Sequence, residues 1–153
     1  MDALDAIRAL LAAESTLALA TAGEDGHAHS TPLFYLAGEQ FRLYWFSSPR
    51  SAHSGNCLRD PLVSVSVYRP TDDWRRILGV EMRGSVRLVP SGPERKSVAG
   101  RYAERFQLNP ALRLALRASS LYCFTPRWVR LVDNAKGFAA RCELELPAQQ
   151  GAP

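Results

Sequence analysis

The sequence predicts a mainly β domain, a closed or nearly closed barrel of six or seven antiparallel strands with a few helices. Most of the chain consists of short segments in which apolar and polar residues alternate, separated by turn signals. Helical spacing of apolar residues occurs only at the start and in one later stretch. At 153 residues the chain has the size of one domain, which we assign to residues 1–146, followed by a flexible tail at 147–153.

The first third of the chain predicts one helix followed by three strands. Residues 2–13 place leucine and isoleucine on one helical stripe, with Asp2 as the N-cap. The strands are predicted at 15–22, 27–36 and 41–46. Pro32 cannot donate a hydrogen bond to a neighbouring strand, so the second strand is expected at a sheet edge or a bulge.

The rest of the chain predicts four more strands and two helices. The strands are expected at 62–68, 77–89, 120–132 and 137–146, and the helices at 91–106 and 109–118. Gly79 and Gly84 interrupt the long second strand of this set, where bulges would let it bend around a barrel. Ser91 and Asn109, each shortly before a proline, are the expected helix caps.

Composition and charge exclude several classes of protein. No apolar run approaches the roughly 20 residues that span a bilayer, and the acidic start is no signal peptide, so we expect a cytoplasmic protein without membrane contact. The three cysteines, Cys57, Cys123 and Cys142, include no CxxC pair and predict partly buried thiols in a reducing compartment. The net charge of +4 is modest and its basic residues alternate with apolar ones, so nucleic-acid binding is not favoured.

Motifs of the common enzyme classes are absent. The chain has no GxGxxG, GxxxxGK[ST], HExxH or GxSxG pattern. His27 and His29 lie two apart on one strand face, but no neighbouring residue completes a tetrahedral ligand set, so no metal site is predicted. His53 lacks an evident nucleophile or orienting partner, and no catalytic residue is assigned.

The stretch "SSPRSAHSGNC", residues 47–57, permits two interpretations. Three short hydroxyl donors, Ser47, Ser48 and Ser51, stand beside Arg50 and His53, which suits a phosphate that needs several donors and a cation. The same residues also describe a strand end, a proline turn and a helix capped by Ser51. The preceding aromatic residues Tyr44, Trp45 and Phe46 either pack along a flat ring ligand or belong to the core, and core is the commoner role.

The order of these segments, from about Leu17 to Phe138, resembles the pyridoxamine 5′-phosphate oxidase-like, FMN-binding split-barrel superfamily. "SSPRSAHSGNCLRDPLVSVSV" follows the spacing of the family's phosphate-binding segment, and "WRRILGVEMRGSVRLV" is similar to its long central strand. "LYCFTPRWVRLVDNAKGF" is similar to the end of a subgroup of small uncharacterised members. The resemblance implies a six- to seven-stranded split barrel and a homodimer that holds FMN at the subunit interface.

The resemblance also implies a set of cofactor-binding residues. The segment His29, Ser30, Thr31 and Pro32 would line the flavin ring, with Phe46 beside it. Ser47, Ser48, Arg50, Ser51 and His53 would hold the phosphate, and Trp74 with residues 134–138 would form an outer wall. His53 stands where the family commonly has a lysine, which reduces the positive charge at the phosphate. The true oxidase's arginines and histidine near the C-terminus have no clear match, so we do not predict pyridoxamine oxidation.

Two functions remain open on this basis, and nucleic-acid binding through the basic surface is a third that the charge pattern does not favour. The first is an FMN-dependent oxidoreductase acting on a small substrate that the sequence does not identify. The second is a non-catalytic module of the same fold that binds or senses flavin or haem. A shared fold does not distinguish between them, because function depends on the site and not on the architecture.

Overall fold

The computed structural model describes residues 2–149; the last four residues of the predicted tail, 150–153, lie outside it. The helices are α1 (Ala3–Ala13), α2 (Ala52–Arg59), α3 (Pro93–Arg105) and α4 (Pro110–Ala118), with 3-10 turns η1 (Glu39–Phe41), η2 (Trp74–Arg76) and η3 (Asn134–Lys136). The strands are β1 (Thr16–Ala22), β2 (Ala28–Phe34), β3 (Leu36–Ala37), β4 (Leu43–Ser47), β5 (Leu62–Tyr68), β6 (Leu78–Val89), β7 (Ser120–Asp133) and β8 (Arg141–Glu145). None of the helices in this part of the chain has the length and apolar character needed to cross a bilayer.

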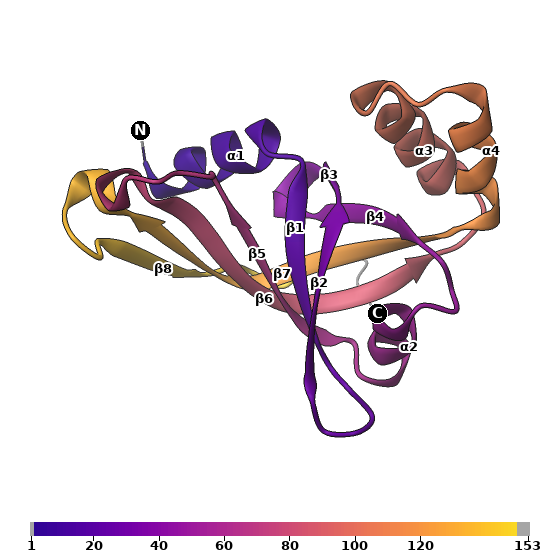
Figure 1. Ribbon diagram of the computed structural model, residues 1–153, viewed down its shortest axis with the longest axis horizontal. Coiled ribbons are helices and arrows are strands. Elements are labelled where there is room, and N and C mark those ends of the chain that lie inside the picture. Colours follow the sequence, from indigo (N-terminus) through magenta and orange to yellow (C-terminus); the bar gives the residue numbers. More distant parts are fainter. Residues whose placement is uncertain (1, 150–153) are drawn as a thin grey trace.

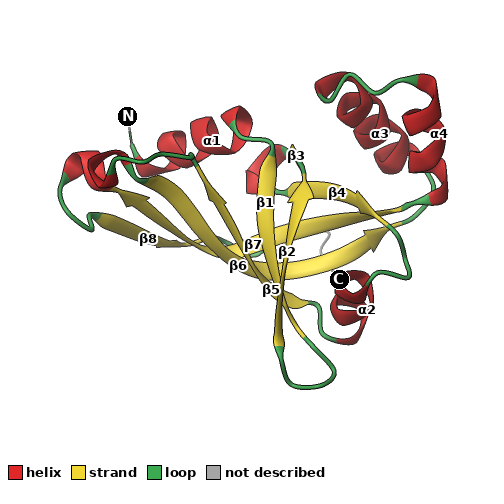
Figure 2. Cartoon of the chain, in the orientation of Figure 1, coloured by secondary structure: helices red, strands yellow, loops and turns green. Residues whose placement is uncertain are grey.

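The strands form one curled antiparallel sheet, the split barrel that the sequence predicts (Figures 1 and 2). Its order is β2-β1-β5-β6-β7-β4-β3, and β8 also pairs with β7. All seven predicted strands are present, and the additional strand is β3, which has two residues. β2 lies at an edge of the sheet, as Pro32 predicts, because its proline needs no partner on that side.

The inner face of the curled sheet and helix α1 enclose the main core. Ile7, Leu10 and Leu11 of α1 are buried against alternating residues of the strands. The Tyr35 hydroxyl donates to the Leu11 carbonyl at 2.8 Å, which fixes the end of the helix to the sheet. Asp2 accepts a hydrogen bond from the Asp5 amide at 2.8 Å, so the predicted N-cap is confirmed.

Helices α3 and α4 cover the opposite face of β4 and β7. Here Tyr44, Leu121 and Cys123 pack against Val98 and Tyr102 of α3 in a second apolar cluster. β7 is therefore buried on both faces from residue 121 to residue 126, which explains its continuous apolar run.

The two predicted caps of this helical pair have different outcomes. Asn109 caps α4 by accepting from the Leu112 amide at 2.9 Å, as expected. The prediction that Ser91 caps α3 was wrong. The N-cap is Gly92, whose φ of 148° is open to glycine alone.

One of the two predicted bulges is present in the long hairpin of β6 and β7. The register shifts between Arg83 and Gly84, so that Gly84 faces Pro126 and Arg127 has no partner in β6. Pro126 lacks an amide hydrogen and is accommodated in β7 at this bulge. The prediction for Gly79 was wrong, because it pairs regularly with Val132 and with Tyr68.

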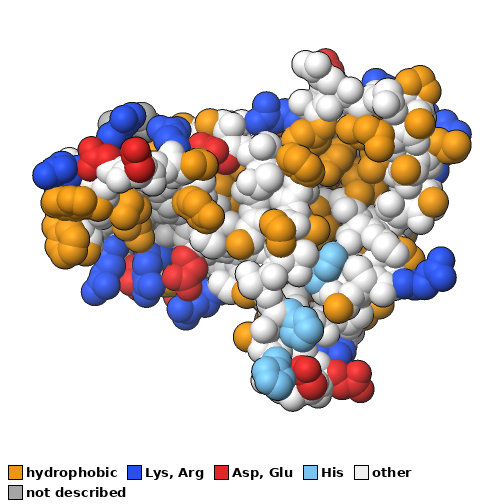
Figure 3. All heavy atoms as spheres, viewed as in Figure 1, with side chains coloured by type: hydrophobic (Ala, Val, Ile, Leu, Met, Phe, Trp, Pro, Cys, Tyr) orange, Lys and Arg blue, Asp and Glu red, His pale blue; other side chains and the backbone are white. Residues whose placement is uncertain are grey.

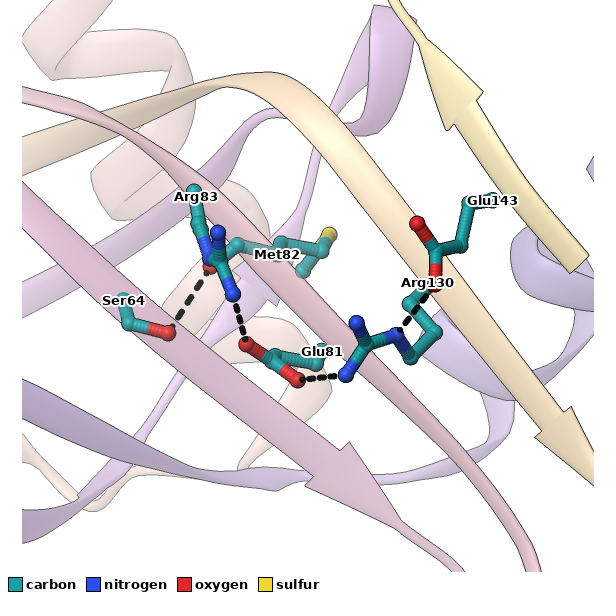
Figure 4. Close-up of polar contacts among 6 residues, drawn as sticks. All are labelled: Ser64, Glu81, Met82, Arg83, Arg130 and Glu143. Carbon is teal, nitrogen blue, oxygen red and sulfur yellow. Dashed lines mark hydrogen bonds and ion pairs between the residues drawn. The ribbon is translucent and has the colours of Figure 1, made fainter. Parts of the chain in front are cut away.

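The outer face of β6, β7 and β8 carries a ladder of ion pairs (Figure 4). Glu81 accepts from Arg83 and from Arg130, both at 3.2 Å, and Arg130 also pairs with Glu143 at 3.0 Å. Arg83 and Arg130 both lie over the ring of Trp128, with 4.3 and 4.9 Å to its centroid. Charges of both signs thus pair with one another across three strands.

The C-terminal part departs from its predicted pattern. β8 begins at Arg141 and not at residue 137, and Phe138 before it is 81% exposed. Cys142 is exposed, which corrects the expectation of a partly buried thiol, whereas Cys57 and Cys123 are buried. Of the predicted tail, Gln149 accepts from Arg42 Nε at 2.7 Å and donates to the Gln40 carbonyl at 2.9 Å.

Candidate functional site

The polar stretch after β4 forms a tight turn into α2. Ser47 ends the strand, and Ser51 is the N-cap of α2, accepting from the Ser54 amide at 3.3 Å. The Ser51 hydroxyl donates to the Ser48 carbonyl at 2.9 Å, and the Arg50 amide donates to Ser48 Oγ at 3.2 Å. The interpretation of these serines as turn and cap residues is therefore confirmed.

The same turn also brings three polar side chains to one point. His53 Nε2 lies 2.5 Å from Ser47 Oγ and 3.2 Å from Ser51 Oγ, and the two serine oxygens are 3.4 Å apart. Ser47 belongs to the strand and His53 to the first turn of the helix, so the cluster joins two elements. Capping and convergence are compatible, because Ser51 takes part in both.

The cluster has the donor chemistry of an anion site. It consists of hydroxyls, an imidazole and the first amides of α2, which carry the positive end of the helix dipole. Arg50 is exposed beside it, and its guanidinium has no hydrogen bond or ion pair with residues 2–149. No carboxylate of residues 2–149 contacts Ser47, Ser51 or His53.

The imidazole is half-buried, and this burial lowers the pKa of His53 below its ordinary 6.5. The folded protein therefore takes up this proton less readily than the unfolded chain does. The contribution of the uncharged His53 to the free energy of unfolding is fully present above about pH 6.5 and is lost as the pH falls through the lowered pKa.

We expect a stability loss on acidification that depends on His53. Urea unfolding across this pH range should show a steeper decline for the wild type than for His53→Gln, which keeps a polar group near Ser47 but does not titrate. The control is His27→Gln, which makes the same substitution at a side chain that is 83% exposed on the β1–β2 turn. Parallel profiles for the wild type and His53→Gln would contradict the assignment.

Helix α2 is anchored to the end of the barrel by two polar contacts, of which one is buried. Asn56 Nδ2 donates to Thr21 Oγ1 at 3.0 Å, and both side chains are buried. Arg59 donates to the Ala22 carbonyl at 2.5 Å and to Asn56 Oδ1 at 3.1 Å. Burial raises the pKa of the adjacent Cys57 thiol to about 11, so this cysteine stays protonated and unreactive near neutral pH. The second half of α2 is thus joined to the end of β1.

The four predicted ring-lining residues of β2 are divided between two faces. His29 and Thr31 are half-buried opposite the buried Thr21 and Leu19, whereas Ser30 and Pro32 are exposed on the other side. His29 lines a pocket of about 510 Å³ between the β1–β2 hairpin and α2. Ala52 and Asn56 of α2 form its other wall, so His29 approaches the helix that carries His53.

The aromatic residues of β4 do not form a ring slot together. Tyr44 and Trp45 are 7% and 1% exposed, each in one of the two apolar clusters, so their core role is confirmed. Phe46 faces α3, where it meets Tyr102 edge-on at 5.1 Å between ring centroids. Ser47 faces His53, and adjacent strand residues point to opposite faces, so Phe46 does not contact the serine and histidine cluster.

Trp74 is not brought to the cluster within one chain. It lies in η2, which follows β5 at the end away from α2, about 20 Å along a seven-residue strand. Trp74 packs edge-on against Phe138 at 5.6 Å, and Asn134 Nδ2 donates to the Trp74 carbonyl at 2.7 Å. Figure 3 shows hydrophobic side chains gathered at this end of the molecule, at the left of the view.

Sequence reasoning missed three residues that build the site. Ser54 is buried with its hydroxyl 2.8 Å from that of Ser51, and Asn56 and Thr21 form the buried anchor of α2. The spacing Ser51-x-x-Ser54 was a usable signal, since the third helical residue commonly meets the cap. The contact of Asn56 with Thr21 spans 35 positions and had no local signal.

Known proteins of similar sequence and structure identify the fold family. Residues 3–133 match the family described as pyridoxamine 5′-phosphate oxidase. No curated protein matches the chain.

Three similar solved structures illustrate the range of this fold. A conserved hypothetical protein of Mycobacterium tuberculosis has a TM-score of 0.76 and 20% identity, with 100% of this chain and 93% of that chain covered. A heme binding protein from Mycobacterium smegmatis has a TM-score of 0.73 and 18% identity, with 95% of this chain and 58% of that chain covered. A FAD-binding protein from Mesorhizobium loti has a TM-score of 0.62 and 21% identity, with 84% of this chain and 92% of that chain covered. At these identities the likeness concerns the fold alone, whereas the sequence match spans most of the chain, and the chain therefore belongs to the pyridoxamine 5′-phosphate oxidase family.

Proposed function

We propose that this protein binds a flavin, and specifically FMN, with the phosphate at the N-terminus of α2. The observation that carries the proposal is the convergence of Ser47, Ser51 and His53, with His53 Nε2 at 2.5 and 3.2 Å from the two hydroxyls. Family membership supports a flavin, and the FAD-binding protein from Mesorhizobium loti shares the fold.

The residues present suit a phosphate. The Ser47 hydroxyl and the amides at the start of α2 supply short donors, and Arg50 next to them supplies a cation without an ion-pair partner in residues 2–149. At neutral pH His53 is largely uncharged because burial lowers its pKa, so it offers one hydrogen bond and no full charge. We therefore assign the charge compensation to Arg50 and the helix N-terminus.

A bound flavin would supply hydride or one-electron transfer, while the protein holds and orients it. The pocket beside His29, about 510 Å³, lies next to the first turn of α2 and offers room for part of the ring system. Ser30 and Pro32, on the outer face of β2, reach a ring only from the exposed side of that strand.

The proposal includes a homodimer in which the second copy completes the site. Trp74 is 51% exposed and Phe138 81% exposed, and they form an aromatic pair far from the cluster of the same chain. An exposed aromatic pair at the end of a small barrel suits contact with another subunit. Sedimentation of the purified protein, alone and with FMN, tests this part directly.

The central prediction separates the phosphate from the ring. For Ser47→Ala we expect about a tenfold loss of FMN affinity, because a hydrogen bond to a charged group contributes roughly 1.5–3 kcal/mol. Riboflavin lacks the phosphate, and its affinity should not change. Both constants are measured by the quenching of flavin fluorescence on titration with protein.

Two further variants make this test decisive. Ser66→Ala removes a half-exposed hydroxyl on β5, and should leave both affinities unchanged. His53→Lys adds a charge and should tighten FMN but not riboflavin. An equal loss of both ligands in Ser47→Ala would contradict the phosphate assignment, and absence of FMN binding to the wild type would refute the proposed function.

Turnover decides between an oxidoreductase, which we propose, and a flavin-binding module. We expect the flavin bands of the FMN-loaded protein to bleach with a reduced nicotinamide and to return on oxidation. Failure to bleach with either nicotinamide would favour the non-catalytic alternative.

A further inference from the structure

A second pocket lies between α3 and α4, on the opposite face of β4 from the serine and histidine cluster. Its volume is about 320 Å³, near the lower end of the roughly 300–1,000 Å³ of small-molecule sites. The apolar part of its lining includes Phe46 and Leu116, and three arginines complete it, Arg95, Arg113 and Arg117. Phe46 and Ser47 are consecutive residues, so the two sites lie on either side of the same strand end.

The arginines of this pocket are not neutralised. Arg95 is held by the carbonyls of Leu116 and Ser119 at 3.1 and 2.7 Å, and Arg113 Nε donates to the Leu108 carbonyl at 3.0 Å. These acceptors are neutral and leave the cationic charge in place. Arg117 has no hydrogen bond or ion pair with residues 2–149, and no Asp or Glu lines the pocket.

The charge of the protein is concentrated in this helical pair. Residues 93–118 contain six of the 19 Lys and Arg residues but only two of the 15 Asp and Glu residues, so their net charge equals the +4 of the entire chain. One of the two acids, Glu94, is bound to Arg87 at 2.6 Å and faces away from the pocket lining. The sequence pattern suggests solvated arginines on α3, but Arg95 instead lies over the Phe46 ring, 5.4 Å from its centroid.

Small residues keep the apolar part of the pocket open. Ala99, Gly100 and Ala103 of α3 face it, and a Cβ placed on Gly100 would meet no atom within 4 Å. Glycine in a helix interior is unfavourable relative to alanine, and no neighbouring atom requires a glycine here. The space beside Gly100 is therefore available to a ligand. The pocket therefore combines an aromatic wall, small floor residues and guanidinium groups.

We propose that this pocket binds a small organic anion with an apolar body, such as an aromatic carboxylate or sulfonate. The apolar body packs on Phe46 and Leu116 between the helices. The anionic group meets the guanidinium of Arg117 and the two terminal nitrogens of Arg113, since Arg113 Nε already donates to the Leu108 carbonyl. This site is separate from the proposed flavin site, because its side chains point to the other face of β4.

The test uses the fluorescent anion 1-anilinonaphthalene-8-sulfonate and its neutral parent, 1-anilinonaphthalene. We expect saturable binding of the sulfonate to the wild type, weakened about tenfold in Arg113→Gln/Arg117→Gln, since two charge-assisted contacts are lost. Affinity for the neutral parent should stay the same in that variant. Gly100→Leu places a side chain in the open space of the pocket and should weaken both probes.

Matched controls separate this site from other surfaces. Arg101→Gln removes the same charge from α3 outside the pocket, where Arg101 donates to the Ala37 carbonyl, and should leave sulfonate binding unchanged. Ser47→Ala should also leave it unchanged, so failure of the flavin proposal would be distinguishable from failure of this one. Absence of saturable binding, or equal binding by the wild type and Gly100→Leu with an unchanged unfolding curve, would overturn the proposal.

Discussion

Replacement of Gly84 by alanine is expected to destabilise the protein by about 3 kcal/mol or more. A Cβ at this position would lie 2.8 Å from Pro126 Cα and 2.9 Å from the Thr125 carbonyl carbon, and it would also overlap the Thr125 oxygen. All of these are backbone atoms of β7, which cannot rotate away as a side chain would.

The surrounding pairing prevents relief of this clash. β6 is hydrogen-bonded to β5 on one side and β7 on the other, and Gly84 itself pairs with Val63 and Pro126. Movement of β6 would therefore break two ladders at once, and the bulge at Arg127 would have to be rebuilt. Urea unfolding measures the effect, and a midpoint temperature lower by about 10 °C should accompany it.

Gly100→Ala is the matched control for this substitution. Its new methyl group meets nothing within 4 Å, and it lies in the interior of α3, so we expect a gain of about 0.5–1 kcal/mol. A Gly84→Ala variant within about 1 kcal/mol of the wild type would show that the bulge is not held as described.

Replacement of Trp45 by alanine is expected to cost about 3–5 kcal/mol of unfolding free energy. Trp45 is 1% exposed and stacks on Tyr122, with ring centroids 6.3 Å apart, inside the main core. Removing the indole leaves a large cavity that the neighbouring strands cannot close. Leu62→Ala, at a leucine that is 70% exposed on β5, should cost far less.

The Trp45 position also tests what the aromatic strand does. If Trp45 belongs to the core alone, Trp45→Phe should retain the FMN affinity of the wild type while unfolding at lower urea concentration. A selective loss of flavin binding in a stable Trp45→Phe variant would instead place the indole in the ring site. Fluorescence titration and urea unfolding of the same preparation provide both numbers.

The candidate site was predictable where its residues are close in sequence. Ser47, Ser51 and His53 lie within seven positions, and strand end, cap and first helical turn are determined by local geometry. The expected role of Phe46 depends on which side of the sheet it faces. The expected role of Trp74 depends on which end of the barrel β5 leads to. Those are properties of the assembled sheet, and Phe46 accordingly lies in the α3–α4 pocket and Trp74 at the far end.

The sequence alone predicted seven of the eight strands, the helices α1, α3 and α4, the edge position of Pro32 and the bulge at Gly84, because periodicity, proline and glycine act through local backbone geometry. The tertiary structure decided which faces are covered. Both faces of β7 are buried because α3 and α4 pack on the side that the barrel core does not reach. It also decided that Phe46 and three arginines share a pocket, because the packing of α3 and α4 brings together residues up to 71 positions apart.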